Sequence, residues 1–310
     1  MDSPRNETRM NCFIKVPVLL LIAERHVLLA NIIANFLLML TASFGNVSII
    51  VSFMFVSSLR STSNYLLFGL ALTDLCVGFV VHPQYIYVML NLYNNSVPPC
   101  QVIAVYSIAA SSLAGISLLF ITVIGADRYL AIRLNLRYQQ HVTKRRIVIT
   151  EIALWLTCGL LSLVWLEGFR VYSTFAAVIV ALSLFLMFTV YTRLYAVVKR
   201  HKAQIQSQIE SQMYQNEHLR AKRLRKSAIN TFYVFFTFLL CYLPFFIVTA
   251  INNMSDSPSK VAVTIYEFIT TLMLSNSSIN PLMYCFRLRD FRVAVRKTYS
   301  RMFCMHSTEE

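Results

Sequence analysis

The chain has 310 residues, of which 57% are hydrophobic and only 14% are charged, and its formal net charge is +14. A soluble globular domain carries about 25% charged residues, so a chain this long and this apolar is expected to bury its surface in lipid. Glycine (7) and proline (8) are scarce, which excludes collagen-like and low-complexity architectures. The seven cysteines include no CxxC pair, so zinc and redox sites are not expected.

The first 26 residues are predicted to form an N-terminal segment. Its apolar stretch 13–22 is short, carries Lys15 and lacks the cleavage pattern of a signal peptide. We expect this stretch to lie on the membrane surface or over the mouth of the helix bundle.

Seven apolar stretches follow, each near the length of about 20 residues that a helix needs to cross a bilayer. They span residues 27–56, 64–90, 100–131, 147–168, 173–198, 227–251 and 262–286. The loops between them are short, which favours one compact bundle over several domains. The sequence therefore predicts an all-α membrane protein, with a seven-transmembrane bundle over residues 27–286.

The lysines and arginines decide the predicted orientation. Only six of the 28 lie in the N-terminal segment or in loops on its side, whereas the cluster 199–226 and the tail lie on the other side. The positive-inside rule predicts an extracellular N-terminus and a cytoplasmic C-terminus at the plasma membrane. Topology and anionic lipid then account for the positive charge, so nucleic-acid binding is not expected. The outer sequons make Asn6, Asn94 and Asn253 candidates for glycosylation.

Several polar residues lie inside the predicted spans, where ionisable groups are costly and usually face the bundle interior. Asp74 lies in the middle of the second span, and Asn276 and Asn280 share one face of the seventh because they are four residues apart. Asn46, Ser117 and Ser277 add further oxygens. A carboxylate with hydroxyl and amide oxygens can hold a sodium ion. A water-filled network without a fixed ion is the alternative, and the residues alone favour it.

The third span ends on Asp127-Arg128-Tyr129, which by itself can be an interfacial anchor. Pro244 in the sixth span and Pro281 in the seventh each free a backbone carbonyl and bend the helix, which suits a hinge. Each feature alone is weak, because transmembrane helices tolerate proline.

Residues 287–310 are predicted to form a short amphipathic eighth helix and a cytoplasmic tail. Apolar residues such as Phe291, Val293 and Val295 alternate with basic groups, which is typical of a helix on the inner leaflet. Cys304 follows as a candidate for palmitoylation. A free thiol is an equally good interpretation.

Each predicted span also carries one anchor motif, in a fixed order. The anchors are Gly45-Asn46, Leu70-x-x-x-Asp74, Asp127-Arg128-Tyr129, Trp155, Tyr191, Pro244 and Asn280-Pro281-x-x-Tyr284. In order and spacing they resemble the rhodopsin-like (class A) G-protein-coupled receptors over nearly the whole chain. The resemblance implies a receptor that converts the binding of an extracellular ligand into activation of a heterotrimeric G protein.

The resemblance also implies roles for individual residues. The sodium pocket of the family corresponds to Asp74, Ser117, Asn276, Ser277 and Asn280, which raises the sodium hypothesis above a plain water network. The activation switch and G-protein contact correspond to Asp127, Arg128, Tyr129, Leu136, Tyr191, Phe238, Tyr242, Pro244, Asn280, Pro281 and Tyr284. Within this set Arg128 meets the G protein, and Leu136 is the hydrophobic plug. Tyr242 replaces the tryptophan that the family usually has.

The chain departs from the family pattern at the extracellular side. Cys100 lies about three residues before the usual position, and the second extracellular loop near 167–172 is short and contains no cysteine. Ser183 replaces the usual proline of the fifth span. These departures resemble the group that contains melanocortin, lysophospholipid and cannabinoid receptors. Cys12 and Cys100 are the remaining candidates for an extracellular disulfide, with two free thiols as the alternative.

The ligand positions of the family suggest a ligand class by exclusion. Ala110 stands where amine receptors keep an aspartate, and Leu274 stands where opsins keep the retinal-binding lysine. A lipid or a peptide is therefore expected more than an amine. The family's pocket corresponds here to Gln84, Tyr106, Ser107, Ala110, Glu167, Phe245, Phe246, Thr249, Tyr266, Glu267 and Thr270, some of which are expected only to pack between helices.

Rival functions remain open at this point. A transporter would use Asp74 as a carrier, but no inverted repeat or paired broken helices are evident. A ligand scavenger would have the same fold without coupling to a G protein. An enzyme is not expected, because no nucleophile–base or metal constellation is evident, and no cofactor is expected apart from sodium as an allosteric ion.

Overall fold

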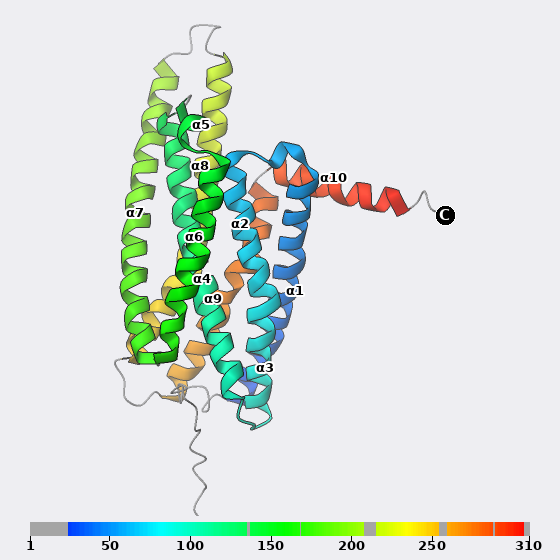
Figure 1. Ribbon diagram of the computed structural model, residues 1–310, viewed down its shortest axis with the longest axis vertical. Coiled ribbons are helices and arrows are strands. Elements are labelled where there is room, and N and C mark those ends of the chain that lie inside the picture. The colour runs from blue at the N-terminus through cyan, green and yellow to red at the C-terminus, as the bar shows by residue number, and fades with distance from the viewer. Residues whose placement is uncertain are drawn as a thin grey trace, which may run out of the picture.

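The computed structural model describes residues 24–134, 137–167, 169–207, 215–253, 259–287 and 289–306. These residues are almost entirely helical, and the helices run side by side in one bundle (Figure 1). The helices are α1 (Arg25–Phe55), α2 (Thr62–Cys76), α3 (His82–Tyr93), α4 (Cys100–Leu134), α5 (Tyr138–His141), α6 (Lys144–Ser162), α7 (Phe169–Ser207), α8 (Gln215–Asn253), α9 (Lys260–Arg287) and α10 (Arg289–His306), with short turns η2 (Ser57–Leu59), η3 (Val77–Val81) and η5 (Leu163–Glu167).

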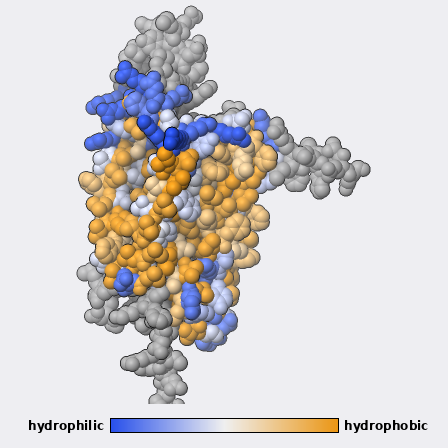
Figure 2. Space-filling view, viewed as in Figure 1, coloured by the Kyte–Doolittle hydropathy of each residue, from blue (hydrophilic) through white to orange (hydrophobic). Residues whose placement is uncertain are grey.

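The outer surface of the bundle is apolar. Phe44, Phe185 and Phe286 are 70%, 73% and 75% exposed, which suits lipid and not water. Figure 2 shows a broad hydrophobic band around the visible face, with hydrophilic residues above and below it. Helices with this composition can satisfy all their backbone hydrogen bonds within a bilayer.

Six segments of the described residues are long and apolar enough to cross a membrane, and they match the first six predicted spans. The seventh, α9, has 28 residues but is less apolar, because five of the six residues 275–280 are serines or asparagines. Most of those residues are buried. The predicted seven-helix architecture is therefore confirmed, with the seventh span adapted to a polar interior.

The second span is not one regular helix. A π-helical turn, η3, separates α2 from α3, and Pro83 lies in the first turn of α3. Proline removes a backbone donor and clashes with the preceding turn, and a widened turn accommodates that clash. The extra residue rotates the following helix, so that His82 and Tyr85 are buried.

Two helices organise the packing of the others. α4 is central and packs against α2, α6, α7 and α8, whereas α1 packs against α3 and α9. Gly45 allows a close approach of α1 to α9, since a Cβ atom there would lie 2.7 Å from Pro281 Cγ. α4 therefore runs through the bundle from one end to the other and contacts most of the other long helices.

α10 leaves the bundle sideways after α9 (Figure 1). Its apolar side turns inward: Phe291 is buried and lies 6.2 Å from the Tyr284 ring, measured between ring centroids. The hydroxyls of Tyr299 and Ser48 are hydrogen-bonded at 2.7 Å, which holds α10 against α1. The predicted amphipathic helix is thus confirmed, and it runs for 18 residues.

Candidate functional site

A cavity of roughly 200 Å³ lies within the half of the bundle remote from α5 and α10. α3, α4, α6, α7, α8 and α9 form its walls together with η5, and most of the lining is apolar or aromatic. Tyr106, Ser107, Ala110, Phe245, Phe246, Tyr266, Glu267 and Thr270 are the residues of the predicted ligand pocket that line it. Rings of α8 and α9 are packed side by side there, with the centroids of Phe245 and Tyr266 5.9 Å apart.

Three residues of the predicted ligand pocket do not belong to this lining. Tyr85, and not its neighbour Gln84, lines the cavity, because the π-helical turn η3 rotates α3 by about one position. Glu167 is exposed at the end of η5, and Thr249 lies beyond Phe246 along α8. Only Pro83 signals the wider turn in the sequence, so Tyr85 was not among the predicted residues.

Glu267 is the acidic residue of the cavity lining. Its side chain is only 1% exposed. The Tyr85 hydroxyl donates a hydrogen bond of 2.5 Å to its Oε2 atom, while its Oε1 atom has no hydrogen-bond partner among the described residues. The bond joins α3 to α9 across the cavity wall.

A second buried polar cluster clamps α1, α3 and α9 beside this bond. Asn35 Nδ2 donates to Thr271 Oγ1 at 2.8 Å, and Thr271 Oγ1 donates to Asn31 Oδ1 at 2.6 Å. His82 Nδ1 lies 3.0 Å from Asn35 Oδ1. The sequence interpretation missed this cluster, although Asn31 and Asn35 stand four residues apart in an apolar span, which is the available signal.

The predicted sodium-pocket residues are all buried in the middle of the bundle. Asn280 Nδ2 donates to Asp74 Oδ2 at 2.7 Å, which joins α9 to α2. Asn46 Nδ2 donates to the Ser277 carbonyl oxygen at 3.0 Å, which joins α1 to α9. The sequence therefore identified residues that meet across three helices.

The oxygens around Asp74 suit a small hard cation with water. Asp74 Oδ1, Ser117 Oγ, Asn276 Oδ1 and Asn280 Oδ1 are buried without a hydrogen-bond partner among the described residues. Carboxylate, hydroxyl and amide oxygens are the ligands that hard cations prefer. The residues present therefore fit the ion that the family implies.

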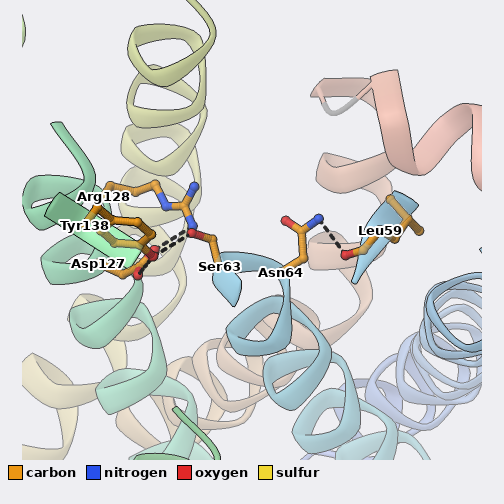
Figure 3. A network of polar contacts seen from close by, with 6 residues as sticks. All are labelled: Leu59, Ser63, Asn64, Asp127, Arg128 and Tyr138. Carbon is orange, nitrogen blue, oxygen red and sulfur yellow. Dashed lines mark hydrogen bonds and ion pairs between the residues drawn. The ribbon is translucent and has the colours of Figure 1, made fainter. Parts of the chain in front are cut away.

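The opposite end of the bundle holds a compact ion-pair network (Figure 3). Arg128 pairs with Asp127 at 2.6 Å, and their side chains are 13% and 4% exposed. Tyr138 of α5 donates a second hydrogen bond to Asp127, and its hydroxyl lies 3.0 Å from the Ser63 hydroxyl of α2. Asp127 is thus held by its own helix and by the following loop.

Tyr138 and Ser63 were not among the predicted switch residues. Burial raises the pKa of Tyr138, and the neighbouring Asp127 carboxylate raises that pKa further. The Tyr138 hydroxyl consequently keeps its proton at physiological pH and remains a donor to Asp127. A tyrosine in a loop gives no sequence signal for this role without knowledge of the loop's fold.

Other predicted switch residues lie between the cavity and the Asp127–Arg128 pair. Phe238 and Tyr242 are buried on α8 with stacked rings whose centroids lie 4.0 Å apart. Tyr191 is buried between α4 and α8, and its hydroxyl lies 3.5 Å from the Ile121 and Thr231 carbonyl oxygens. Pro244 and Pro281 lie inside α8 and α9, as predicted.

Several predicted residues fall outside the described part of the chain. Leu136, Cys12 and Asn6 are among them, and the side chains of Asn253 and Cys304 are not described either. Cys100 is disulfide-bonded, so a bond at this cysteine agrees with the sequence interpretation, and Cys12 as its partner stays a prediction. Asn94 is exposed in the turn after α3, which suits its predicted glycosylation.

Comparison with known proteins finds several receptors that are similar to this chain over most of its length. The octopamine receptor beta-2R of Chilo suppressalis is 26% identical over 86% of this chain and 79% of its own length. The human adenosine receptor A2a is 27% identical over 83% of this chain and 68% of its own length. The adenosine receptor A3 of Canis lupus familiaris is 27% identical over 90% of this chain and 95% of its own.

These relatives do not include melanocortin, lysophospholipid or cannabinoid receptors, so the resemblance to that group is not confirmed. Residues 45–172 and 164–284 match the family described as the 7 transmembrane receptor (rhodopsin family). The match includes the cavity walls, the Asp74 cluster and the Asp127–Arg128 pair. The chain belongs to the rhodopsin family of seven-transmembrane receptors, and it is a multi-pass membrane receptor rather than an enzyme.

Proposed function

We propose that this receptor binds a small extracellular ligand in the cavity and transmits the signal to a heterotrimeric G protein. The main support for the proposal is that α4 reaches from the cavity to the Asp127–Arg128 pair. This helix lines the cavity from Ile103 to Leu119 and carries the Asp127–Arg128 pair near its other end. One rigid element therefore connects the place where a ligand fits with the residue that would meet a G protein.

The size and lining of the cavity favour a small ligand over a lipid with an anionic headgroup or a peptide. A volume of roughly 200 Å³ is small, since drug-sized sites measure about 300–1,000 Å³. The cavity lining that the structure describes contains no lysine, arginine or histidine. Relatives whose names specify octopamine or adenosine support a compact ligand with an aromatic or basic group. The earlier expectation of a lipid or peptide lacks such support.

Activation is proposed to be a population shift. A ligand that binds one conformation more tightly than the other moves the equilibrium by that difference in affinity. Phe238 and Tyr242 lie six and two residues before Pro244, and Phe246 of the same helix lines the cavity. A rotation or bend of α8 at Pro244 would transmit occupancy of the cavity to the end of α8 beside Tyr191.

The orientation in the membrane follows from the same proposal. The cavity would face the extracellular side, and the Asp127–Arg128 pair, α5 and α10 would face the cytoplasm. The excess of lysine and arginine near α5, α10 and the 199–226 cluster supports this orientation. Sodium bound near Asp74 would stabilise the resting conformation as an allosteric ion.

The proposal can be tested in cells with G-protein dissociation sensors for several Gα subtypes. Cells that express the receptor would be exposed to libraries of small amines, nucleosides, lipids and peptides. A response is expected from a small amine or nucleoside, and Arg128→Ala should abolish that response while binding of the compound persists. A ligand that binds in the cavity without activating any Gα subtype would favour the scavenger alternative.

A further inference from the structure

The cavity contains a buried carboxyl group that has no basic partner among the described lining residues. Glu267 is 1% exposed and lines the cavity, and its Oε1 atom has no hydrogen-bond partner among the described residues. Tyr85 donates to the other oxygen only. A buried carboxylate that lacks a full set of partners is costly, and in a membrane span it marks a functional position.

The groups around Glu267 would attract a cation. Tyr85 and Tyr106 lie with ring centroids 5.7 Å apart beside it, and Tyr266 precedes it on α9. Aromatic rings attract ammonium groups through their negative faces. The described lining contains no lysine, arginine or histidine that could occupy this place.

The far end of the same cavity is apolar. Leu118, Leu119 and Cys158 line it between α4 and α6, and Ile179 lines it from α7. α6 and α7 both pack against α4. A ligand with an ammonium group at one end and an aromatic or aliphatic body at the other would match both ends of the cavity.

We propose that Glu267 is the anionic anchor for a protonated amine, so that this receptor holds its ligand's cation on α9. The usual anchor position on α4 is Ala110, which lines the cavity without any charge. The absence of an aspartate at position 110 therefore does not exclude an amine ligand. The ligand's cation would bind to Glu267 on α9 instead of to a residue on α4. This inference rests on the proposed receptor function, because it names the ligand class of the same cavity.

The test is the thermal unfolding of purified receptor with matched probes. The probes are phenylalkylamines with chains of increasing length and the phenylalkanols of the same length, which differ in charge and hardly in shape. Four receptors are compared: wild type, Glu267→Gln, Tyr85→Phe and Glu151→Gln. Glu151 is the matched control, because its Oε1 atom is also buried without a partner but the residue lies outside the cavity lining.

The wild type is expected to be stabilised by the amines at concentrations roughly tenfold or more below those of the alcohols, because a charge-assisted hydrogen bond is replaced by a neutral one. Glu267→Gln should lose this preference. Glu151→Gln should keep it. Tyr85→Phe should also keep it, since it removes the bond to α3 but leaves the carboxylate in place.

Two results would overturn the assignment: wild type without preference for the amines, or Glu267→Gln with the preference intact. The unfolding assay needs no G protein, so a receptor that fails to couple but prefers amines would contradict only the proposed coupling. A receptor that signals to another ligand and shows no amine preference would contradict only the role of Glu267. Correct folding of each variant is verified by its unfolding midpoint without probe.

Discussion

At the scale of single residues, Asp127 restrains Arg128 and is itself held in place by Tyr138. It forms the 2.6 Å ion pair with Arg128 and accepts the hydrogen bond from Tyr138. The Tyr138 hydroxyl in turn contacts Ser63, so the pair is tied to α2 as well as to α5. Under the proposed function, this ion pair would restrain Arg128 in the resting receptor.

The first prediction concerns this restraint. Asp127→Asn should raise ligand-free signalling, because it weakens a charge-assisted interaction of about 1.5–3 kcal/mol and so shifts the population towards the released state. Tyr138→Phe should raise it less, since the ion pair persists. A G-protein dissociation sensor in cells with matched surface expression measures both. Equal signalling by all three receptors would contradict this role for Asp127.

The second prediction concerns the buried oxygens around Asp74. If sodium binds there, it stabilises the folded receptor by mass action, so the unfolding midpoint of purified wild type should rise with sodium chloride. Potassium chloride at the same ionic strength is the control and should have a smaller effect. Asp74→Asn should remove the difference between the salts. A sodium effect that survives in Asp74→Asn would show that the ion binds elsewhere.

At the scale of helices, close approach and hinges depend on particular positions. Gly45 lets α1 touch Pro281 of α9, and the two helices also share the Asn46–Ser277 bond. α8 contains Pro244 two residues after Tyr242 of the Phe238–Tyr242 stack. Packing between α1 and α9 therefore fixes one side of the bundle, while α8 has a built-in site for bending.

The third prediction tests the α1–α9 contact. Gly45→Ala would place a Cβ atom 2.7 Å from Pro281 Cγ, and overpacking of this kind typically costs about 1–3 kcal/mol. The unfolding midpoint and the surface expression should fall. Gly159→Ala is the matched control, since no atom lies within 4 Å of its Cβ position, and it should leave both quantities unchanged or slightly higher.

The fourth prediction tests whether α8 bends at Pro244 during activation. Pro244→Ala restores a backbone donor to the helix and so should make α8 harder to bend at this position. In the Asp127→Asn background, where signalling needs no ligand, it should lower the signal while the protein still reaches the cell surface. Unchanged signalling in the double variant would mean that α8 does not move about Pro244.

At the scale of the whole molecule, the spans and their polar interior could be predicted because the bilayer imposes them. Lipid requires long apolar helices, and a carboxylate such as Asp74 can be tolerated only if it faces inward. The η3 turn could not be predicted, because it reflects how Pro83 is accommodated between two helices. Tyr138 and the Asn35–Thr271 bond were missed for a related reason: their partners are decided by tertiary packing, which no local pattern reveals.

The fifth prediction concerns the orientation of the bundle. An epitope at the N-terminus should be accessible to antibody on intact cells, because few lysines and arginines lie on that side. An epitope after the C-terminal residue should be accessible only once the cells are permeabilised. The reverse pattern would place the cavity in the cytoplasm and rule out an extracellular ligand.

The measurement that tests the central claim most directly is nucleotide exchange on purified G proteins by receptor reconstituted in lipid nanodiscs. Asp127→Asn should accelerate GDP–GTP exchange on at least one heterotrimer without ligand, and the double variant Asp127→Asn/Arg128→Ala should not, because Arg128 is proposed to contact the G protein. A folded Asp127→Asn receptor that accelerates exchange on no heterotrimer, or a double variant as active as the single one, would contradict the proposed coupling.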